Sequence, residues 1–191
     1  MSETQISHFS LISRLFGNLF FRAPTDPILA GTFDWLRQKG LNQIWALSAD
    51  SESESESALN SLQMNMDLNV LEQEYQKLFG LEGKVPTAIS VYGIDPEAFI
   101  HFREVHNMPA IEPREKAEHF ALLLLTASWL EDNTDSALAQ RILFSNFLLP
   151  CAARFLTQVE TYAVLPFYRA LAYLTREILA ATADELEEGA E

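Results

Sequence analysis

Cysteine and positive charge are both scarce in this chain of 191 residues. Cys151 is the only cysteine, which excludes an internal disulfide and any metal site with several cysteine ligands, and which agrees with a reducing compartment. Lys and Arg number 13 against 27 Asp and Glu, for a net charge of −14. Such a chain repels phosphates and anionic headgroups. We therefore predict a cytoplasmic protein that binds no nucleic acid and favours cationic peptides.

Long apolar runs and a secretory leader are missing as well. The most apolar stretch, residues 120–130, would extend only about 16 Å as a helix, against about 30 Å for the core of a bilayer. The N-terminal sequence MSETQISHFSLISRLF has no basic leader followed by a long apolar stretch and a cleavage site. We expect neither export nor stable membrane insertion.

Strand patterns are absent too, because no stretch sustains an alternation of apolar and polar residues. Apolar residues instead recur at helical spacing, and 48% apolar composition is enough to form a core. The sequence predicts an all-α protein: a single globular bundle of about nine or ten helices that spans residues 1–191.

The sequence EPREKAEHFALLLLTASWLED at 112–132 predicts the central helix of this bundle. Pro113 suits a first helical position, and Glu115 and Glu118 would place negative charge near the positive end of the helix dipole. The run 120–130 keeps no polar face, which is typical of a helix covered on all sides.

Other helices are marked by caps, prolines and apolar spacing. The expected ranges are 5–21, 26–39 with Gly40 as its left-handed end, 59–79, 95–107, and 166–181 followed by a frayed acidic tail.

Three segments are predicted to lie outside long helices. The sequence SADSESESESA at 48–58 alternates serine with acid and predicts a solvated surface loop. The segment 80–93 contains three glycines and Pro86, and we interpret it as a functional loop. Prolines flank residues 107–113, which are a candidate hinge between an N-terminal half (1–108) and a C-terminal half (114–191). We expect a monomer in which such a hinge would permit a domain-swapped dimer.

Glu115, Glu118 and His119 form the candidate site, and two interpretations of it stay open. They are either a charged helix start with a histidine at the rim of the core, or a site that holds a cationic ligand by charge-assisted hydrogen bonds. His101 and His106 would point about 140° apart on a helix and could not easily share a metal ion. We predict no metal site and no cofactor.

Five stretches of the sequence together resemble the TorD/DmsD/NarJ family of redox-enzyme maturation chaperones. They are EYQKLFG (74–80), SVYG (90–93), EHFALLLLTASWLED (118–132), FLLPCAARFLTQVE (147–160) and PFYRALAYLTREIL (166–179). The resemblance implies an all-helical cytoplasmic protein without catalytic activity. It also implies binding of the twin-arginine signal peptide, and sometimes the folded body, of a molybdenum-cofactor enzyme precursor until the cofactor is in place.

The resemblance also implies a peptide-binding groove. The matching positions are Arg14, Phe21, Leu78, Phe79, Pro86, Ser90, Val91, Tyr92, Glu115, Glu118 and His119. Two positions depart from the family pattern. Pro86-Thr87-Ala88 replaces Pro-Pro-aromatic, which removes an aromatic wall, and Glu118-His119 replaces Asp-His, which keeps the charge.

The leading hypothesis is a binding module whose acidic groove holds an arginine-bearing segment of a metalloenzyme precursor. The stretches ASWLED, LLP and DELEE also resemble a branch of the family that serves a soluble metal-dependent phosphohydrolase. A third hypothesis is a small helical enzyme that uses Glu118 and His119 as an acid–base pair. A plain interaction subunit would instead show an exposed apolar face and no pocket at residues 78–92.

Overall fold

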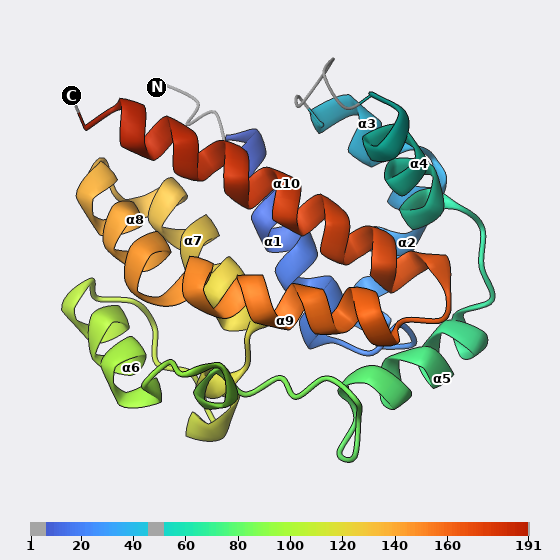
Figure 1. The fold of residues 1–191 in the computed structure, drawn as a ribbon, viewed down its shortest axis with the longest axis horizontal. Helices are drawn as coiled ribbons and strands as arrows, with labels where there is room; N and C mark the ends of the chain where they lie inside the picture. Colours follow the sequence, from blue (N-terminus) through green and yellow to red (C-terminus); the bar gives the residue numbers. More distant parts are fainter. Residues whose placement is uncertain (1–6, 46–51, 191) are drawn as a thin grey trace.

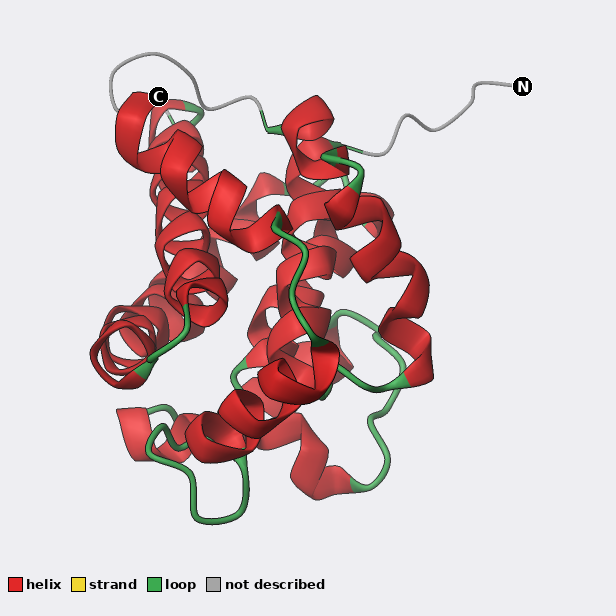
Figure 2. Cartoon of the chain, turned by 90° about the vertical axis from the view of Figure 1, so that its right-hand side faces the viewer, coloured by secondary structure: helices red, strands yellow, loops and turns green. Residues whose placement is uncertain are grey.

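The computed structural model describes residues 7–45 and 52–190, and these residues form helices and loops without a strand (Figure 2). The α-helices are α1 (His8–Phe21), α2 (Ala30–Arg37), α3 (Gly40–Ile44), α4 (Glu52–Gln63), α5 (Leu68–Phe79), α6 (Pro96–Val105), α7 (Ala121–Asn133), α8 (Ala137–Leu143), α9 (Leu149–Tyr162) and α10 (Pro166–Glu188). Short helical turns are η1 (Pro27–Leu29), η2 (Ile89–Tyr92), η3 (Arg114–Glu118) and the π-helical η4 (Phe144–Leu148). The predicted all-α class is confirmed.

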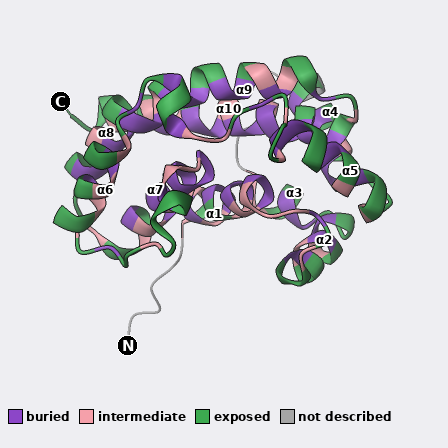
Figure 3. Ribbon diagram, turned by 90° about the horizontal axis from the view of Figure 1, so that it is seen from below, coloured by how far each residue is buried: buried purple, intermediate pink, exposed green. Residues whose placement is uncertain are grey.

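Helices α1 and α7 form one layer of the molecule, and α9 and α10 form the other (Figures 1 and 3). Small residues let α1 approach α7 closely. A side chain at Gly17 would bring its Cβ within 2.8 Å of Leu125. The Ser10 and Ser128 hydroxyls lie 2.9 Å apart, and the Ser13 hydroxyl donates to the Leu124 carbonyl at 2.7 Å. Because these bonds are buried, they fix the register of the pair.

An aromatic cluster joins both layers at the centre of the core. Phe20 of α1 lies 5.4 Å from Phe155 of α9, ring centroid to centroid, and Phe155 stacks on Phe120 at 4.0 Å. Phe79 of α5 and Tyr168 of α10 complete the cluster, with centroids 5.5 Å apart. All five rings are buried, so this cluster holds five segments of the chain together.

Helix α7 is the predicted central helix, and its side chains are largely buried, as its sequence indicated. The predicted start at Pro113 is wrong. Residues 114–118 form the separate turn η3, and His119 is extended, with φ −72° and ψ 134°. The Phe120 N–H donates to the Thr87 carbonyl at 2.7 Å, so a contact with a distant loop interrupts the helical path. Glu115 and Glu118 therefore precede α7 and do not belong to its first turn.

Two local predictions before residue 60 are also wrong. Lys39, with φ 61°, takes the left-handed conformation that was assigned to Gly40, and Gly40 opens α3. Gly40 is needed for space, because a Cβ there would lie 2.2 Å from the ring of Trp35. Residues 52–58 belong to α4, which packs on α10 with Ser55 and Ala58 buried, so they are not a loop. The rest of the predicted loop, 48–51, lies outside the described residues.

Later boundaries differ from expectation for similar reasons. Residues 64–67 separate α4 from α5 within the predicted 59–79 range. Helix α10 continues to Glu188, so the acidic tail is not frayed there. It is held partly by Arg141, whose Nε donates to the Leu186 carbonyl at 2.8 Å.

Ala137–Tyr162 is one continuous helical stretch that is long and apolar enough to span a membrane by length and composition. Half of its most apolar window is buried within the protein, and η4 and α9 pack against other elements of the bundle. Core helices pass the same test, so the stretch is weak evidence for a membrane span.

Residues 107–113 contain no helix, as predicted. However, α1 from the N-terminal half packs along α7 from the C-terminal half, and α4 packs on α10. Arg103 also donates to the Pro109 carbonyl at 3.0 Å and thereby holds the linker. The two halves share one core, and the hinge stays a prediction.

Candidate functional site

The loop 80–93 and the start of α7 lie side by side, as the candidate site requires. Ala88 and His119 form an isolated antiparallel bridge, next to the hydrogen bond from Phe120 to Thr87. The Tyr92 hydroxyl donates to the Pro86 carbonyl at 2.6 Å and closes the loop on itself. Two segments about thirty residues apart in sequence are thus one structural unit.

His119 has a structural role in this unit. Its Nδ1 accepts the N–H of Ala121 at 3.0 Å, which caps the first turn of α7, and its ring meets Phe21 edge to face at 5.1 Å. Burial lowers the pKa of His119 from 6.5 to about 4, because the charged form loses hydration. The imidazole is therefore neutral near pH 7, and the N-terminus of α7 is occupied by the protein itself.

Three predicted groove residues lie in the core. Leu78 and Phe79 of α5 and Tyr92 of η2 are all less than one-tenth exposed, and Phe79 belongs to the aromatic cluster. Their apolar surfaces are already covered by the protein, and their assignment to a peptide-binding groove stays a prediction.

The other predicted residues near this unit are accessible. Pro86, Ser90, Val91 and Glu115 are exposed and Glu118 is partly exposed. We call these five residues the acidic surface. No ion pair or hydrogen bond engages the Glu115 or Glu118 carboxylate within the described part of the chain.

The sequence EYQKLFG has an architectural role that sequence reasoning missed. Glu74 is buried, and its Oε1 accepts the N–H groups of Val164 and Leu165 at 2.7 and 3.0 Å. The Tyr75 hydroxyl lies 3.1 and 3.0 Å from the carbonyls of Phe20 and Phe21, at the end of α1. An acid beside an aromatic residue on the buried face of an amphipathic helix was the available signal.

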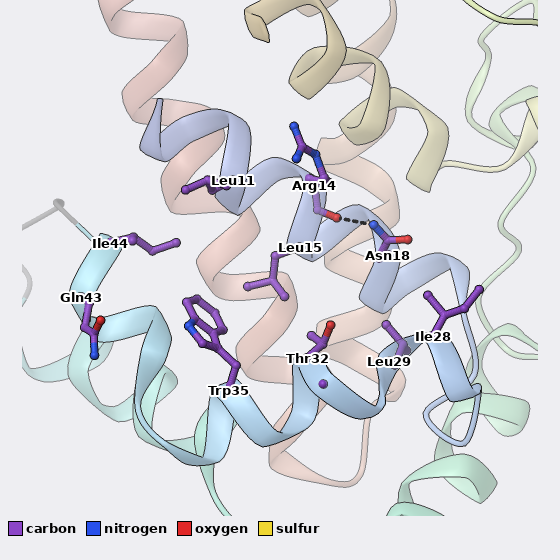
Figure 4. Close-up of a pocket in the computed structure, with 11 residues that line it drawn as sticks. Leu11, Arg14, Leu15, Asn18, Ile28, Leu29, Thr32, Trp35, Gln43 and Ile44 are labelled. Carbon is purple, nitrogen blue, oxygen red and sulfur yellow. Dashed lines mark hydrogen bonds between the residues drawn. The ribbon is translucent and has the colours of Figure 1, made fainter. Parts of the chain in front are cut away.

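Arg14 lines a different groove, whose lining includes none of the five residues of the acidic surface (Figure 4). This groove has a volume of about 610 Å³ and runs between α1 and the η1–α3 segment. Its lining residues are Leu11, Arg14, Leu15, Asn18, Ile28, Leu29, Gly31, Thr32, Trp35, Gln43 and Ile44. We call it the α1–α3 groove. The helical spacing of Leu11, Arg14, Leu15 and Asn18 marks a second face of α1 that could have been recognised from sequence.

Two further features concern nucleophilic and metal-binding side chains. Cys151 is fully buried and burial raises its pKa to about 12, so the thiol is packed in the core. Over residues 7–45 and 52–190, no three His, Cys, Asp or Glu side chains are grouped so as to hold a metal ion.

Comparisons with known proteins identify chaperones among the relatives. No protein-family model matches the chain. A Haemophilus influenzae protein described as uncharacterized is 69% identical over 98% of this chain and 100% of its own length. Chaperone protein YcdY of Escherichia coli is 37% identical over 97% of this chain and all of the relative. The probable Tat proofreading chaperone DmsD of Haemophilus influenzae is 30% identical over 93% of this chain and 91% of its own length.

Proposed function

The chain belongs to the TorD/DmsD family of redox-enzyme maturation chaperones, and from that membership we propose that it holds a metalloenzyme precursor in the cytoplasm until the cofactor is inserted. YcdY and DmsD align with this chain over 97% and 93% of its length, and both are named as chaperones. The chain therefore acts in maturation and not as an enzyme. The proposed precursor is a molybdoenzyme of the DMSO-reductase type with a twin-arginine signal peptide.

The observation that carries the proposed binding site is the junction of residues 87–88 with 119–120. It brings the exposed apolar groups of Pro86 and Val91 into the same unit as Glu118. An arginine-bearing apolar peptide needs both kinds of contact: apolar area for its hydrophobic segment and carboxylates for its guanidinium groups. Among the predicted residues, the acidic surface is the part that supports this function.

A soluble metal-dependent phosphohydrolase is the alternative client. The relative at 37% identity carries a name without reference to export, whereas the relatives at 28–30% are named for Tat proofreading. The two clients differ in the presence of a twin-arginine leader, so binding of such a peptide separates them.

The acid–base enzyme hypothesis is not supported by the geometry of its proposed pair. The Nδ1 atom of His119 already accepts a backbone N–H, and its low pKa leaves it a weak base at neutral pH. Glu118 forms no described hydrogen bond to it.

We predict that Glu118→Lys weakens binding of a synthetic twin-arginine peptide more than tenfold, because an attractive charge contact becomes repulsive. Thermal stability should change little, since Glu118 has no described partner to lose. Titration calorimetry with a peptide that carries paired arginines before an apolar segment measures the affinity. Glu131→Lys, on an exposed position near the other end of α7, is the matched control and should bind like the parent. Equal affinity of all three proteins would remove the acidic surface from the proposal.

A further inference from the structure

The α1–α3 groove is apolar, open and separate from the acidic surface. Six of its lining residues are Leu, Ile or Trp, and Ile28 at its edge is 64% exposed (Figure 4). At Gly31 an added Cβ would meet nothing within 4 Å, so empty space adjoins the backbone of α2. A volume of about 610 Å³ is in the range of grooves that hold a ligand or several side chains of a partner.

The charge of the segment that builds this groove is opposite to that of the chain. Residues 8–45 contain four cations (Arg14, Arg22, Arg37 and Lys39) and two acids (Asp26 and Asp34), whereas the chain has 13 cations and 27 acids. The groove lining includes Arg14 and no carboxylate. Arg14 is ion-paired with Asp132, so the lining offers an acidic partner those guanidinium donors that this pair does not use.

Arg14 is available for such a contact. Its Nη2 bonds Asp132 and lies 3.3 Å from the Ser10 hydroxyl, while the described residues offer no partner to its Nε and Nη1. The side chain is 44% exposed. A carboxylate at the mouth of the groove could accept from these remaining donors.

We propose that the α1–α3 groove binds an amphipathic helix of the client that presents leucine-like side chains on one face and carboxylates beside them. The lining positions of α1 from Leu11 to Asn18 span about 10 Å, or two helical turns, which matches anchors at i, i+3, i+4 and i+7 of a partner helix. The inference rests on the proposed chaperone function and adds a second site, for the body of the precursor and not for its basic leader.

Filling the groove tests this proposal without disturbing the fold. Gly31→Leu places a side chain in the empty space, at a helical position without positive φ, and the thermal midpoint should stay the same or rise. Ala98→Leu adds bulk at an exposed position of α6 and is the matched control. The probe is a synthetic peptide of about 18 residues with leucines at helical spacing and glutamates at the remaining exposed positions. A second peptide carries lysine in place of each glutamate.

Binding is followed by the fluorescence of Trp35, which lines the groove, with Trp35→Phe as the control for the origin of the signal. We expect saturable binding of the glutamate peptide, and about tenfold or greater weakening both for the lysine peptide and in Gly31→Leu. Glu118→Lys should leave the glutamate peptide bound, and Gly31→Leu should leave the twin-arginine peptide bound. These crossed controls separate failure of this groove from failure of the proposed function.

Three results would overturn the proposal. They are no saturable signal with the glutamate peptide, equal or tighter binding of the lysine peptide, and unchanged affinity in folded Gly31→Leu.

Discussion

His119 is the residue at which a chemical and a structural interpretation competed. Its acceptor nitrogen caps α7, and its ring packs on Phe21. The cap needs the neutral imidazole, because protonation of Nδ1 removes the acceptor. At the scale of single residues, the histidine therefore stabilises the start of the central helix.

The lowered pKa of His119 predicts a pH-dependent stability. The pKa falls from 6.5 in the unfolded chain to about 4 in the folded protein, so the unfolded chain binds more protons between these values. The stabilisation is present above pH 6.5 and is lost as the pH falls toward 4. Between pH 6.5 and pH 5.5, the contribution of His119 to the free energy of unfolding should decrease by about 1 kcal/mol. Urea unfolding at both pH values measures this change.

His119→Asn is the control, since its Oδ1 can occupy the position of Nδ1 and accept the same N–H without titrating. Relative to the parent, this variant should lose the decrease between the two pH values. In His119→Ala the cap is missing, so the free energy of unfolding at neutral pH should also fall by about 1 kcal/mol. If the parent and His119→Asn show the same change of stability with pH, His119 is not the group responsible for it.

Helix α5 links elements that are distant in sequence. Glu74 binds the two N–H groups that precede α10, and Tyr75 binds carbonyls at the end of α1. At the scale of elements, α5 therefore joins the ends of the first and last helices of the described chain. Both residues lie in the sequence EYQKLFG, one of the stretches that carry the family resemblance.

Glu74→Ala should lower the free energy of unfolding by about 2–3 kcal/mol, because two N–H groups lose a charged acceptor in a buried place. Glu74→Gln keeps one carbonyl oxygen and should lose less. Lys77→Ala, at an exposed position of the same helix, should change stability by less than about 0.5 kcal/mol. Denaturant titration ranks the variants. If Glu74→Ala is as stable as Lys77→Ala, the hydrogen bonds to Glu74 do not stabilise the fold.

The whole molecule carries a net charge of −14, and its first described segment is slightly basic. Long-range attraction of a cationic leader to this charge should speed encounter. Raising the salt concentration from about 0.05 M to 0.5 M should slow association of the twin-arginine peptide by roughly tenfold, because the screening length shortens. Dissociation should change less.

Stopped-flow mixing measures both rates. The uncharged analogue of the peptide, with glutamine in place of each arginine, should show little salt effect on association. An association rate for the arginine peptide that is independent of salt would mean that the net charge does not steer this encounter.

The all-α class, the enclosed central helix and the family were predictable from the sequence, because apolar periodicity and the order of motifs are local features. The absence of helix at 107–113 and the caps at Asp26 and Asp95 were predictable for the same reason. The proximity of the 80–93 loop to Glu118 was an expectation from the family resemblance, and the bridge between Ala88 and His119 agrees with it.

Which of these residues face solvent depends on how distant segments pack in the fold. Leu78, Phe79 and Tyr92 have the same sequence signal whether they line a groove or fill a core. In the fold, Phe79 and Tyr92 contact aromatic rings of α9 and α10, and Leu78 is buried as well. The start of α7 depended on a hydrogen bond to Thr87, and the helicity of residues 52–58 depended on packing against α10. The α1–α3 groove likewise exists only because η1, α2 and α3 turn back beside α1. Contacts between distant segments are not encoded in local spacing, and so burial and grooves required the fold.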